Sequence, residues 1–407
     1  MPSSTCKARI VFALLGFLVA GACSAAEPVA RVRVAFDRNG VTDTRAEGMA
    51  DVAAGRRLTA DDPARIASIS KLITSIGVMR LVEAGQLDLD ADVSSLLGQP
   101  LRNPVYPDTP ITLRMLLSHT SSLTDDAGYW NVPLGEDSTR ITSQAKAWDA
   151  KHAPGTFFRY SNLNFPIIAQ TMEATTGERF DRLMQRLVLR PMGLSACYNW
   201  SGCDDAAYAR AVVLYDTDGK PVRDDLQGRM PGCMVIAAKD KSCDIAGRWR
   251  AGRNGTLFSP QGGLRISAND LARVGRMLLG EGVIDGRRIL SPASVRALVT
   301  PIWTYANGNG AIIEEDEPNR GGFFCSYGLA VQHLARGNGT TCRDDLFGDG
   351  RPRMGHSGNA YGLLSGLWID RAAGTGVAYF ATGVPNDSTG AHSAFSAVEE
   401  GLAAGTR

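Results

Sequence analysis

Strand-like patterns occur near both ends of this chain, and helical patterns fill the stretch between them. Residues 29–36 alternate in polarity and are rich in valine, as a strand would be. Further strands are expected over 48–58, 326–334, 362–370 and 376–382. We therefore expect an α/β (α+β) fold, in which one antiparallel sheet is built from both ends of the chain and a helical lobe is inserted between them.

The same patterns divide the chain into parts. We expect a signal peptide over 1–26, a sheet lobe from 27–90 and 320–407, and a mainly helical lobe over 91–319. Within the helical lobe, 195–255 is rich in loops and carries four cysteines, which is typical of an excursion tied by disulfides. A cleft between two lobes is the usual place for a substrate site. Helices are expected over 113–117, 165–176, 180–187, 268–279, 292–298 and 391–403.

The first residues have the pattern of a secretory signal. Lys7 and Arg9 precede an apolar run over 10–20, and small residues follow it. The run is too short to span a bilayer, and no other stretch is long and apolar enough for an integral membrane span in the mature chain. We therefore expect an exported protein, periplasmic or secreted. Lipid attachment at Cys23 is the less favoured alternative, because Ala20 stands where a branched aliphatic residue is usual.

The cysteines agree with export. Cys6 and Cys23 lie in or at the edge of the expected signal, and six others remain. An even number in an exported chain indicates disulfides, although six cysteines allow fifteen pairings and the sequence does not choose among them. The nearest-neighbour pairing would be Cys197–Cys203, Cys233–Cys243 and Cys325–Cys342.

Charge and metal-ligand spacing exclude other classes of function. With 43 Lys and Arg against 42 Asp and Glu, the formal net charge is +1, so there is no basic excess to indicate a nucleic-acid partner. The chain contains no C-x-x-C or H-E-x-x-H motif, and its five histidines are scattered. We expect neither a metal nor an organic cofactor.

The segment Ser68-Ile69-Ser70-Lys71 opens a helical run that is apolar on nearly every side and ends at Gly85. Residues three apart on a helix face the same way, so Ser68 and Lys71 are expected to be neighbours. An amine held beside a hydroxyl in an apolar setting can accept its proton, and a helix N-terminus favours developing negative charge. On its own the S-x-x-K pattern favours a capping serine and a solvated lysine, and only the rest of the chain favours a catalytic pair.

Two further short patterns carry groups suited to the same chemistry. Tyr160 and Asn162 share a loop after a Pro-Gly turn, where a phenol can relay a proton and an amide can bind a substrate carbonyl. In Gly355-His356-Ser357-Gly358-Asn359, the glycine would let substrate lie against a strand edge. The N–H of Asn359 could join that of Ser68 as an oxyanion hole.

The order S-x-x-K, Y-x-N, H-x-G along one chain resembles the penicillin-recognising serine hydrolases. The resemblance is greatest to the branch that holds class C β-lactamases, D-Ala-D-Ala carboxypeptidases, D-aminopeptidases and related esterases. Residues 112–123 are similar to the family's T-H-T-S-G-L segment, and 261–272 to its A-G-G-L segment before a helix. These similarities cover most of 29–404.

The resemblance implies a role for each matching residue. Ser68 would be the nucleophile that becomes acylated, and Lys71 and Tyr160 would share the proton transfers. Asn162 would bind the acyl amide. His356 would line the substrate-binding strand, which Gly358 would keep open.

Three features depart from the family pattern. His356 replaces the lysine of the K-T-G that is usual in class C β-lactamases, which favours a peptidase or an esterase. Ser122 stands where a glycine is usual. Arg265 stands where an aromatic residue is often found, and we favour a surface arginine there over a ligand for a substrate carboxylate.

Together these patterns predict an exported hydrolase that forms an acyl-enzyme through Ser68. Its expected substrates are small molecules or peptides, most readily small peptides with D-residues of which it would cleave an amide bond, as a carboxypeptidase or aminopeptidase. A β-lactamase or a promiscuous carboxylesterase is the alternative at the same site. A penicillin-binding or receptor module without turnover is the alternative of another class. The oligomeric state is not predicted.

Overall fold

A large antiparallel sheet dominates the computed structural model, which describes residues 27–313, 320–336, 341–384 and 390–406. Among these residues the sheet has nine strands, and each neighbouring pair is antiparallel. In spatial order they are β11 (Trp303–Thr304), β12 (Ser326–Tyr327), β13 (Gln332–Leu334), β14 (Arg353–Ala360), β15 (Leu363–Asp370), β16 (Thr375–Thr382), β1 (Ala30–Asp37), β2 (Val41–Asp51) and β3 (Arg56–Arg57).

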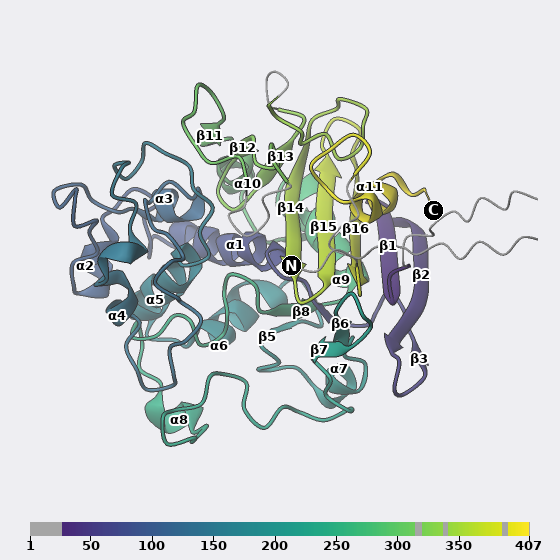
Figure 1. Cartoon of the computed structure of the whole chain (residues 1–407), viewed down its shortest axis with the longest axis horizontal. Coiled ribbons are helices and arrows are strands. Elements are labelled where there is room, and N and C mark those ends of the chain that lie inside the picture. Colours follow the sequence, from purple (N-terminus) through teal and green to yellow (C-terminus); the bar gives the residue numbers. More distant parts are fainter. Residues whose placement is uncertain (1–26, 314–319, 337–340, 385–389, 407) are drawn as a thin grey trace, which may run out of the picture.

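Strands from the two ends of the chain are neighbours within this sheet. β1 lies between β2 and β16, with Ala30 opposite Thr382 and Asp37 opposite Thr375. Figure 1 shows the purple N-terminal strands beside the yellow C-terminal strands. The predicted fold class is thereby confirmed.

Two helices cover opposite faces of the central strands. In β16, Ala378 and Phe380 belong to the larger core, whereas Val377 and Tyr379 belong to a second core. Because successive strand residues point to opposite faces, these cores lie on the two sides of the sheet. Helix α9 (Ala268–Leu279) contributes to the first core, and α11 (Ala397–Ala404) contributes to the second.

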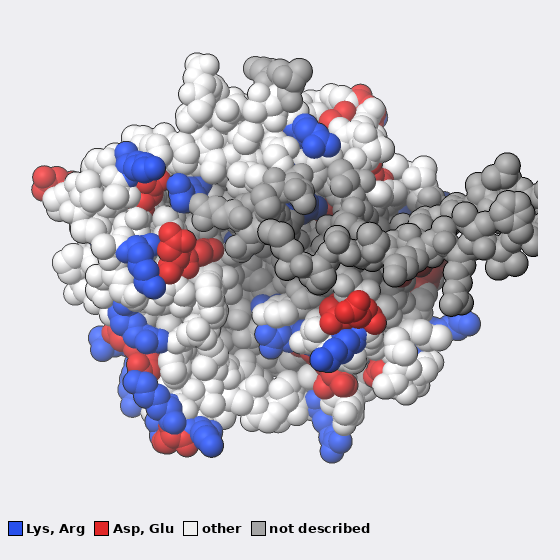
Figure 2. Space-filling view, in the orientation of Figure 1, with Lys and Arg blue, Asp and Glu red and all other residues white. Residues whose placement is uncertain are grey.

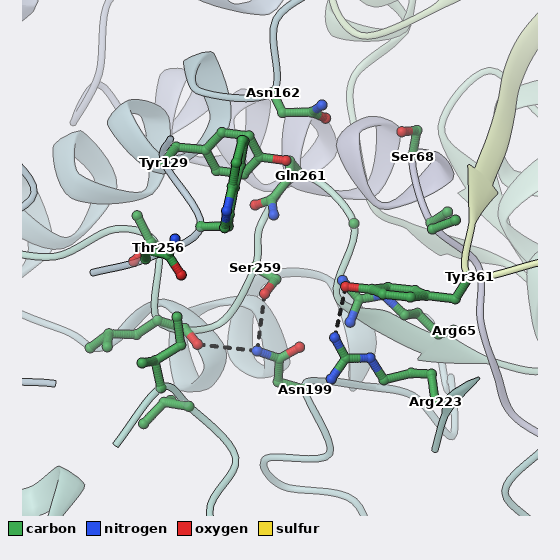
Figure 3. Close-up of a pocket in the computed structure, with 18 of the residues that line it drawn as sticks. Arg65, Ser68, Tyr129, Asn162, Asn199, Arg223, Thr256, Ser259, Gln261 and Tyr361 are labelled. Carbon is green, nitrogen blue, oxygen red and sulfur yellow. Dashed lines mark hydrogen bonds between the residues drawn. The ribbon is translucent and has the colours of Figure 1, made fainter. Parts of the chain in front are cut away.

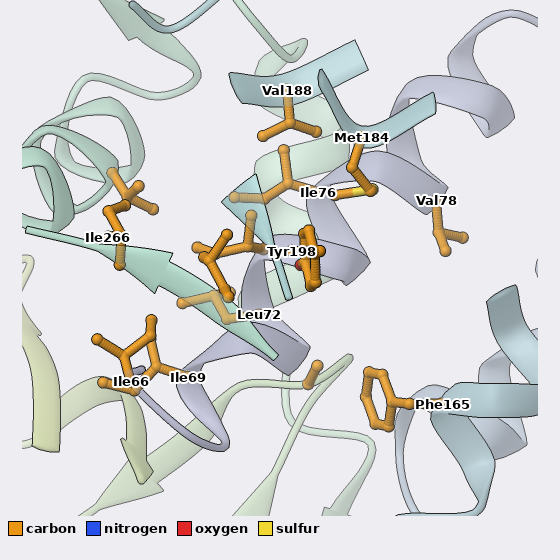
Figure 4. Packing of buried hydrophobic residues seen from close by; sticks show 14 of the residues in the cluster. Ile66, Ile69, Leu72, Ile76, Val78, Phe165, Met184, Val188, Tyr198 and Ile266 are labelled. Atoms are coloured by element: carbon orange, nitrogen blue, oxygen red, sulfur yellow. The ribbon is translucent and has the colours of Figure 1, made fainter. Parts of the chain in front are cut away.

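Helix α1 (Ile69–Glu83) runs through the centre of the larger core. All but three of its residues are buried, as its apolar residues on every side predict. Figure 4 shows its side chains packed among residues from α5 (Asn164–Thr176), α6 (Phe180–Met184), the following π-helical turn (Gln185–Leu189) and the small strand β8 (Leu264–Ile266). A helix held on every side gives its first turn little freedom to move.

The remaining helices and small sheets complete the other side of the molecule (Figure 1). Strand β8 lies between β4 (Ala64–Arg65) and β5 (Cys197–Tyr198) in a three-stranded sheet beside the start of α1. The other elements are α2 (Val93–Leu97), α3 (Leu113–Leu117), α4 (Thr139–Thr142), the 3-10 turn Ala145–Ala147, α7 (Asp205–Ala209), β6 (Leu214–Tyr215), β7 (Pro221–Arg223), α8 (Ile245–Arg248), β9 (Val283–Ile284), β10 (Arg287–Arg288) and α10 (Pro292–Val299).

The division into a sheet lobe and a helical lobe stays a proposal. Much of 91–319 is helical, but α9 lies within that range and packs on β1, β15 and β16. The excursion at 195–255 contributes β5 to the small sheet and otherwise consists mainly of loops.

The cysteines pair as nearest neighbours. The structure contains the disulfides Cys197–Cys203, Cys233–Cys243 and Cys325–Cys342. The nearest-neighbour pairing considered from the sequence is therefore confirmed. Two of the three bonds lie in the 195–255 excursion, where they tie loops that have little regular structure.

Three predicted elements differ from the structure. The final helix begins at Ala397 instead of 391, because Ser396 caps it and the Glu400 carboxylate accepts backbone N–H groups from Ala391 to Ser393 in a non-helical loop. The strand expected over 326–334 is split into β12 and β13 by a turn in which Ala330 has a φ of 58°. β2 starts at Val41, earlier than predicted. Its first half is exposed and lacks the apolar alternation from which a strand is predicted.

No helix in the described part of the chain is long and apolar enough to cross a membrane. The signal peptide, Cys6 and Cys23 lie outside the described residues. On the face shown in Figure 2, positive and negative side chains are interspersed.

Candidate active site

Ser68 stands at the first turn of α1, at the floor of a large cleft. It is the N-cap residue, and its side chain makes no capping hydrogen bond. Ser68 is half-buried, while its neighbours from Asp62 to Met79 are all buried. The residue before it, Ala67, has a φ of 48°, a conformation that costs a non-glycine residue energy and often occurs at functional sites. The turn thus presents one hydroxyl to the cleft at the positive end of a helix.

Lys71 reaches the Ser68 hydroxyl from one turn further along α1. Its Nζ lies 2.9 Å from Ser68 Oγ, 2.8 Å from Asn162 Oδ1 and 2.9 Å from the Gln261 carbonyl oxygen. The same Nζ lies 4.8 Å from the centroid of the Tyr160 ring. Lys71 itself is fully buried. The structure therefore brings Ser68, Lys71, Tyr160 and Asn162 together, as the sequence motifs predicted.

The three contacts of Lys71 serve both of its protonation states. An ammonium can donate one hydrogen bond to each of the three oxygens. A neutral amine can still donate to Asn162 Oδ1 and to the Gln261 carbonyl, which only accept, and its lone pair can then accept the Ser68 hydroxyl proton. A proton can therefore move from Ser68 to Lys71 without a rearrangement of the site.

Asp125 holds the loop that carries Tyr160 and Asn162. Its Oδ1 accepts hydrogen bonds from Ser161 Oγ at 2.8 Å and Leu163 N at 2.9 Å. Its Oδ2 accepts them from Asn162 N at 2.9 Å and Asn162 Nδ2 at 3.1 Å. Because the amide nitrogen of Asn162 points to this carboxylate, its oxygen must point to Lys71. The sequence reasoning missed Asp125.

His119 stacks on the Tyr160 ring. The two rings are stacked with centroids 4.4 Å apart. His119 Nδ1 accepts hydrogen bonds from Ser161 N and Asn164 Nδ2, each at 3.1 Å. Complete burial, with Lys71 nearby, lowers the pKa of His119 well below its usual value, so the ring is neutral. These contacts give His119 a structural role beside Tyr160.

His356 is neutral and faces Tyr327. Its Nδ1 lies 2.5 Å from the Ser357 carbonyl oxygen, which can only accept, so Nδ1 carries the hydrogen. Nε2 then accepts a hydrogen bond from the Tyr327 hydroxyl at 2.7 Å. Burial, with a smaller contribution from Lys71, lowers the pKa of His356 to about 3. His356 is thus a buried residue of β14, and it is not among the residues that line the cleft.

Gly358 lets β14 lie directly against the backbone that leads into Ser68. A Cβ at this position would be 2.5 Å from the Ile66 carbonyl oxygen and 3.1 Å from Ser68 N. The sequence predicted that this glycine keeps room for substrate, but the observed need is the contact with the nucleophile's own segment. Asn359 follows at the cleft wall, so its backbone and that of Ser68 come from adjacent segments.

The cleft has a volume of about 1280 Å³ and extends from Ser68 to the cysteine-rich excursion. Tyr129, Trp130 and Ile236 line an apolar part of it, and Arg65, Arg223 and Tyr361 line a polar part. In Figure 3 the latter group lies on the Ser68 side, with Tyr129 across the opening.

Arg265 is not the surface arginine that the sequence favoured. It is 3% exposed, and its Nη2 and Nε lie 2.8 and 3.1 Å from the two carboxylate oxygens of Asp224. Burial would raise the pKa of Asp224, but Arg265, together with Arg65 and the Trp200 hydrogen bond, lowers it. The partner is 41 residues away in the excursion, which no local pattern could reveal.

Two further contributions to the site carry no side-chain signal in the sequence. Lys71 donates a hydrogen bond to the backbone carbonyl of Gln261, so this contact does not depend on the glutamine side chain. Ser122, where a glycine was expected by resemblance, has a φ of 64°, which explains the preference for glycine in that turn.

Comparison with known proteins gives a family match over nearly the whole described chain. Residues 26–399 match the family model described as Beta-lactamase. Esterase EstB of Burkholderia gladioli is 30% identical over 213 residues, which are 46% of this chain and 51% of EstB. The D-alanyl-D-alanine-carboxypeptidase/endopeptidase AmpH of Escherichia coli is 34% identical over 141 residues, which are 33% of this chain and 36% of AmpH. The matched region thus spans about half of these relatives or less.

Solved structures share the fold. The D-alanine carboxypeptidase AmpC from Burkholderia cenocepacia has a TM-score of 0.63 at 18% identity, over 93% of this chain and 92% of that one. The octameric penicillin-binding protein homologue from Pyrococcus abyssi has a TM-score of 0.63 at 20% identity, over 89% of this chain and 71% of that one. At these identities the likeness concerns the fold alone.

Proposed function

Because this chain belongs to the Beta-lactamase family, we propose that it is a serine hydrolase that forms an acyl-enzyme through Ser68. One observation carries the proposal. Lys71 Nζ lies 2.9 Å from Ser68 Oγ, and the hydroxyl is open to the cleft while the lysine is buried. A nucleophile beside a base that is itself fixed by other groups is the arrangement that covalent catalysis requires.

The proposed reaction has two steps. Ser68 Oγ attacks the carbonyl carbon of an amide or ester, its proton passes to Lys71 or Tyr160, and the leaving group departs with a proton from the same pair. The N–H groups of Ser68 and Asn359 are proposed to stabilise the oxyanion. Water then attacks the acyl carbonyl carbon and gives one proton to Lys71 or Tyr160. The bond between Ser68 Oγ and the acyl group breaks, Ser68 takes up that proton, and the carboxylic acid is released. Asn162 is proposed to bind the acyl amide while it also orients Lys71.

Amide bonds in small peptides with D-residues are the first candidate substrate. The similarity to AmpH, a D-alanyl-D-alanine-carboxypeptidase/endopeptidase by name, supports this substrate class. His356 and Gly358 are proposed to shape the strand beside the substrate, Gly358 by its closeness to Ser68 and His356 by its hydrogen bond with Tyr327.

Carboxylic esters are the second candidate. Esterase EstB is similar over a longer stretch than AmpH, and the lovastatin esterase of Penicillium rubens is 26% identical over 60% of this chain. The apolar part of the cleft, with Trp130 55% exposed, suits an acyl or alcohol group without charge.

We also propose that the protein is exported to the periplasm or secreted. The three disulfides support this, because such bonds persist in oxidising compartments. Mass spectrometry of the N-terminal peptide of the mature protein, compared with that of a Cys23→Ser variant, would distinguish a cleaved signal from a lipid anchor. Detection of the protein in the cytoplasm with an intact N-terminus would contradict the proposal.

The activity is tested with Ser68→Ala and with Ser95→Ala, a matched change at an exposed serine on α2. Purified protein is assayed on D-Ala-D-Ala, a short-chain 4-nitrophenyl ester and a chromogenic cephalosporin, and is labelled with a fluorophosphonate. We expect turnover and labelling in the wild type and Ser95→Ala, and neither in Ser68→Ala. Labelling that persists in Ser68→Ala would refute the assignment, and a burst without turnover would indicate a binding module.

A further inference from the structure

Two arginines face each other in the small sheet beside Ser68. β4 and β8 are antiparallel, and Arg65 is directly opposite Arg265. Like charges in such cross-strand positions destabilise a sheet unless a partner compensates them. Arg65 is three residues before Ser68, and both line the same cleft. The pair therefore concentrates positive charge in the wall next to the nucleophile.

Only one of these two guanidinium groups has a carboxylate of its own. Arg265 binds both oxygens of Asp224, as described above. Arg65 is 8% exposed, and within the described part of the chain its guanidinium makes neither a hydrogen bond nor an ion pair; its Nε is buried without an acceptor. Burial, together with Arg265, lowers the pKa of Arg65 to about 10, so the group is still a cation at neutral pH. Burying a cation costs free energy unless a hydrogen-bond acceptor binds it, so Arg65 is suited to bind an acceptor group of a ligand.

A second arginine and a phenol stand beside Arg65 at the cleft wall. The guanidinium carbon of Arg65 lies 5.0 Å from the centroid of the Tyr361 ring, and that of Arg223 lies 4.4 Å from it. Arg223 Nη2 donates to the Tyr361 hydroxyl at 2.7 Å. Figure 3 shows the three side chains together on the side of the cleft near Ser68. Burial would raise the pKa of Tyr361, but Arg65 and Arg223 outweigh this and lower it.

The acidic residues of this wall offset the charge of Arg65 only in part. The charge of Asp224 acts on Arg65, but among the described residues the two form neither a hydrogen bond nor an ion pair. Asp224 is already held by Arg265 and by the Trp200 ring nitrogen at 3.0 Å. Asp225 is exposed, and among the described residues it forms no ion pair. Arg223 likewise forms no ion pair with a described residue and is exposed to solvent. Two guanidinium groups thus remain for a ligand.

We propose that Arg65 and Arg223, with the Tyr361 hydroxyl, form a subsite for a carboxylate group of the substrate. A guanidinium offers paired donors that match a carboxylate, and partial burial strengthens such contacts. The inference rests on the proposed hydrolysis through Ser68 and adds a preference for substrates that carry a negative charge at a distance from the bond that is cleaved. Arg65 is a specificity residue in this proposal and takes no part in the proton transfers.

The test compares ester pairs that differ by one carboxylate. One pair places it on the acyl group (4-nitrophenyl glutarate against 4-nitrophenyl pentanoate), and the other on the leaving group (3-carboxy-4-nitrophenyl acetate against 4-nitrophenyl acetate). kcat/KM is measured for the wild type, Arg65→Gln, Arg223→Gln and the control Arg182→Gln, an exposed arginine on α6 outside the cleft.

We expect the anionic-to-neutral ratio of kcat/KM to fall about 10- to 100-fold in Arg65→Gln for one of the two pairs, as loss of a charged hydrogen bond predicts. In Arg223→Gln a smaller fall, of about 3- to 10-fold, is expected because this side chain is exposed. Arg182→Gln should keep the wild-type ratio. The pair that responds identifies the side of the scissile bond on which the carboxylate lies.

Two results would overturn the subsite. In one, the ratios stay unchanged in both variants. In the other, Arg65→Gln lowers both members of each pair in parallel, which would mean that Arg65 only shapes the segment before Ser68. If Arg65→Gln does not fold, Arg223→Gln decides, since this exposed residue is not part of a core. Absence of hydrolysis of every ester by the wild type would count against the ester reaction itself and is thus distinct from these outcomes.

Discussion

Replacing Asp125 by asparagine tests whether one carboxylate sets the geometry of the proposed active site. Its two oxygens accept four hydrogen bonds, two each, from the loop that carries Tyr160 and Asn162. Asparagine keeps the size of the side chain but turns one oxygen into an NH₂ donor. Whichever way the new amide is turned, two donors of the loop face another donor.

The expected losses follow from these contacts. A hydrogen bond to a charged group contributes about 1.5–3 kcal/mol, and Asp125 is half-buried. Solvent screening weakens the hydrogen bonds of a half-buried carboxylate. We therefore expect the substitution to lower the free energy of unfolding by about 2–4 kcal/mol. The Asn162 amide also loses the partner that fixes its orientation, so Lys71 loses an aligned acceptor. If this loss of alignment raises the activation free energy by about 2 kcal/mol, kcat/KM falls about 30-fold.

The assay combines urea unfolding with ester hydrolysis. Asp126→Asn is the matched control, because it removes the same charge from the next residue, which is exposed and also lines the cleft. Asp126→Asn should stay within threefold of the wild type in kcat/KM and within 0.5 kcal/mol or so in stability, as is usual for surface changes. Equal effects of the two variants would show that charge near the cleft matters and the hydrogen bonds do not.

Three other predictions concern packing, covalent links and pH. Gly358→Ala should lower kcat/KM at least about 10-fold and stability by about 1–3 kcal/mol, because its Cβ would press on the backbone that leads to the nucleophile. The control is Gly40→Ala, where a Cβ meets nothing within 4 Å. This control should match the wild type in the same ester and urea assays. Replacing Cys197 and Cys203 together by serine should lower the free energy of unfolding by about 2 kcal/mol, the value for so short a loop, and a urea transition unchanged by the replacement would contradict this. Burial lowers the pKa of His333 to about 4, below the usual 6.5. Between these pH values the unfolded chain binds more protons than the folded protein, so stability decreases as the pH is lowered. Between pH 7.5 and pH 5, His333→Gln should lose about 2 kcal/mol less stability than the wild type in urea unfolding, and equal losses would refute the assignment.

The sequence predicted most of what depends on local patterns. The buried helix after Ser68 and the strands near both ends have clear periodicities, and the structure contains them. The spacing of Ser68 and Lys71 on one helix makes their contact a matter of helix geometry. The meeting with Tyr160 and Asn162 depended on resemblance to a family, because no local pattern brings those loops to α1.

What the sequence could not provide are contacts between distant segments and contacts of the backbone. Asp125 lies in a loop without periodicity, and its four hydrogen bonds appear only when the loop of Asn162 is placed beside it. The environment of Arg65 depends on the register of β4 and β8 and on where Asp224 is held. The reason for Gly358 likewise lies in a backbone contact across the fold.

The position of β1 between β2 and β16 affects the order in which this protein can fold. A hairpin of β1 and β2 can form early, but the edge of β1 that later binds β16 stays unpaired until the strand ending at Thr382 has been synthesised. Pairings between residues so distant in sequence close slowly and leave nascent chains prone to aggregation. The free edge of β1 is therefore open to pairing with other strands until nearly all of the chain has been synthesised.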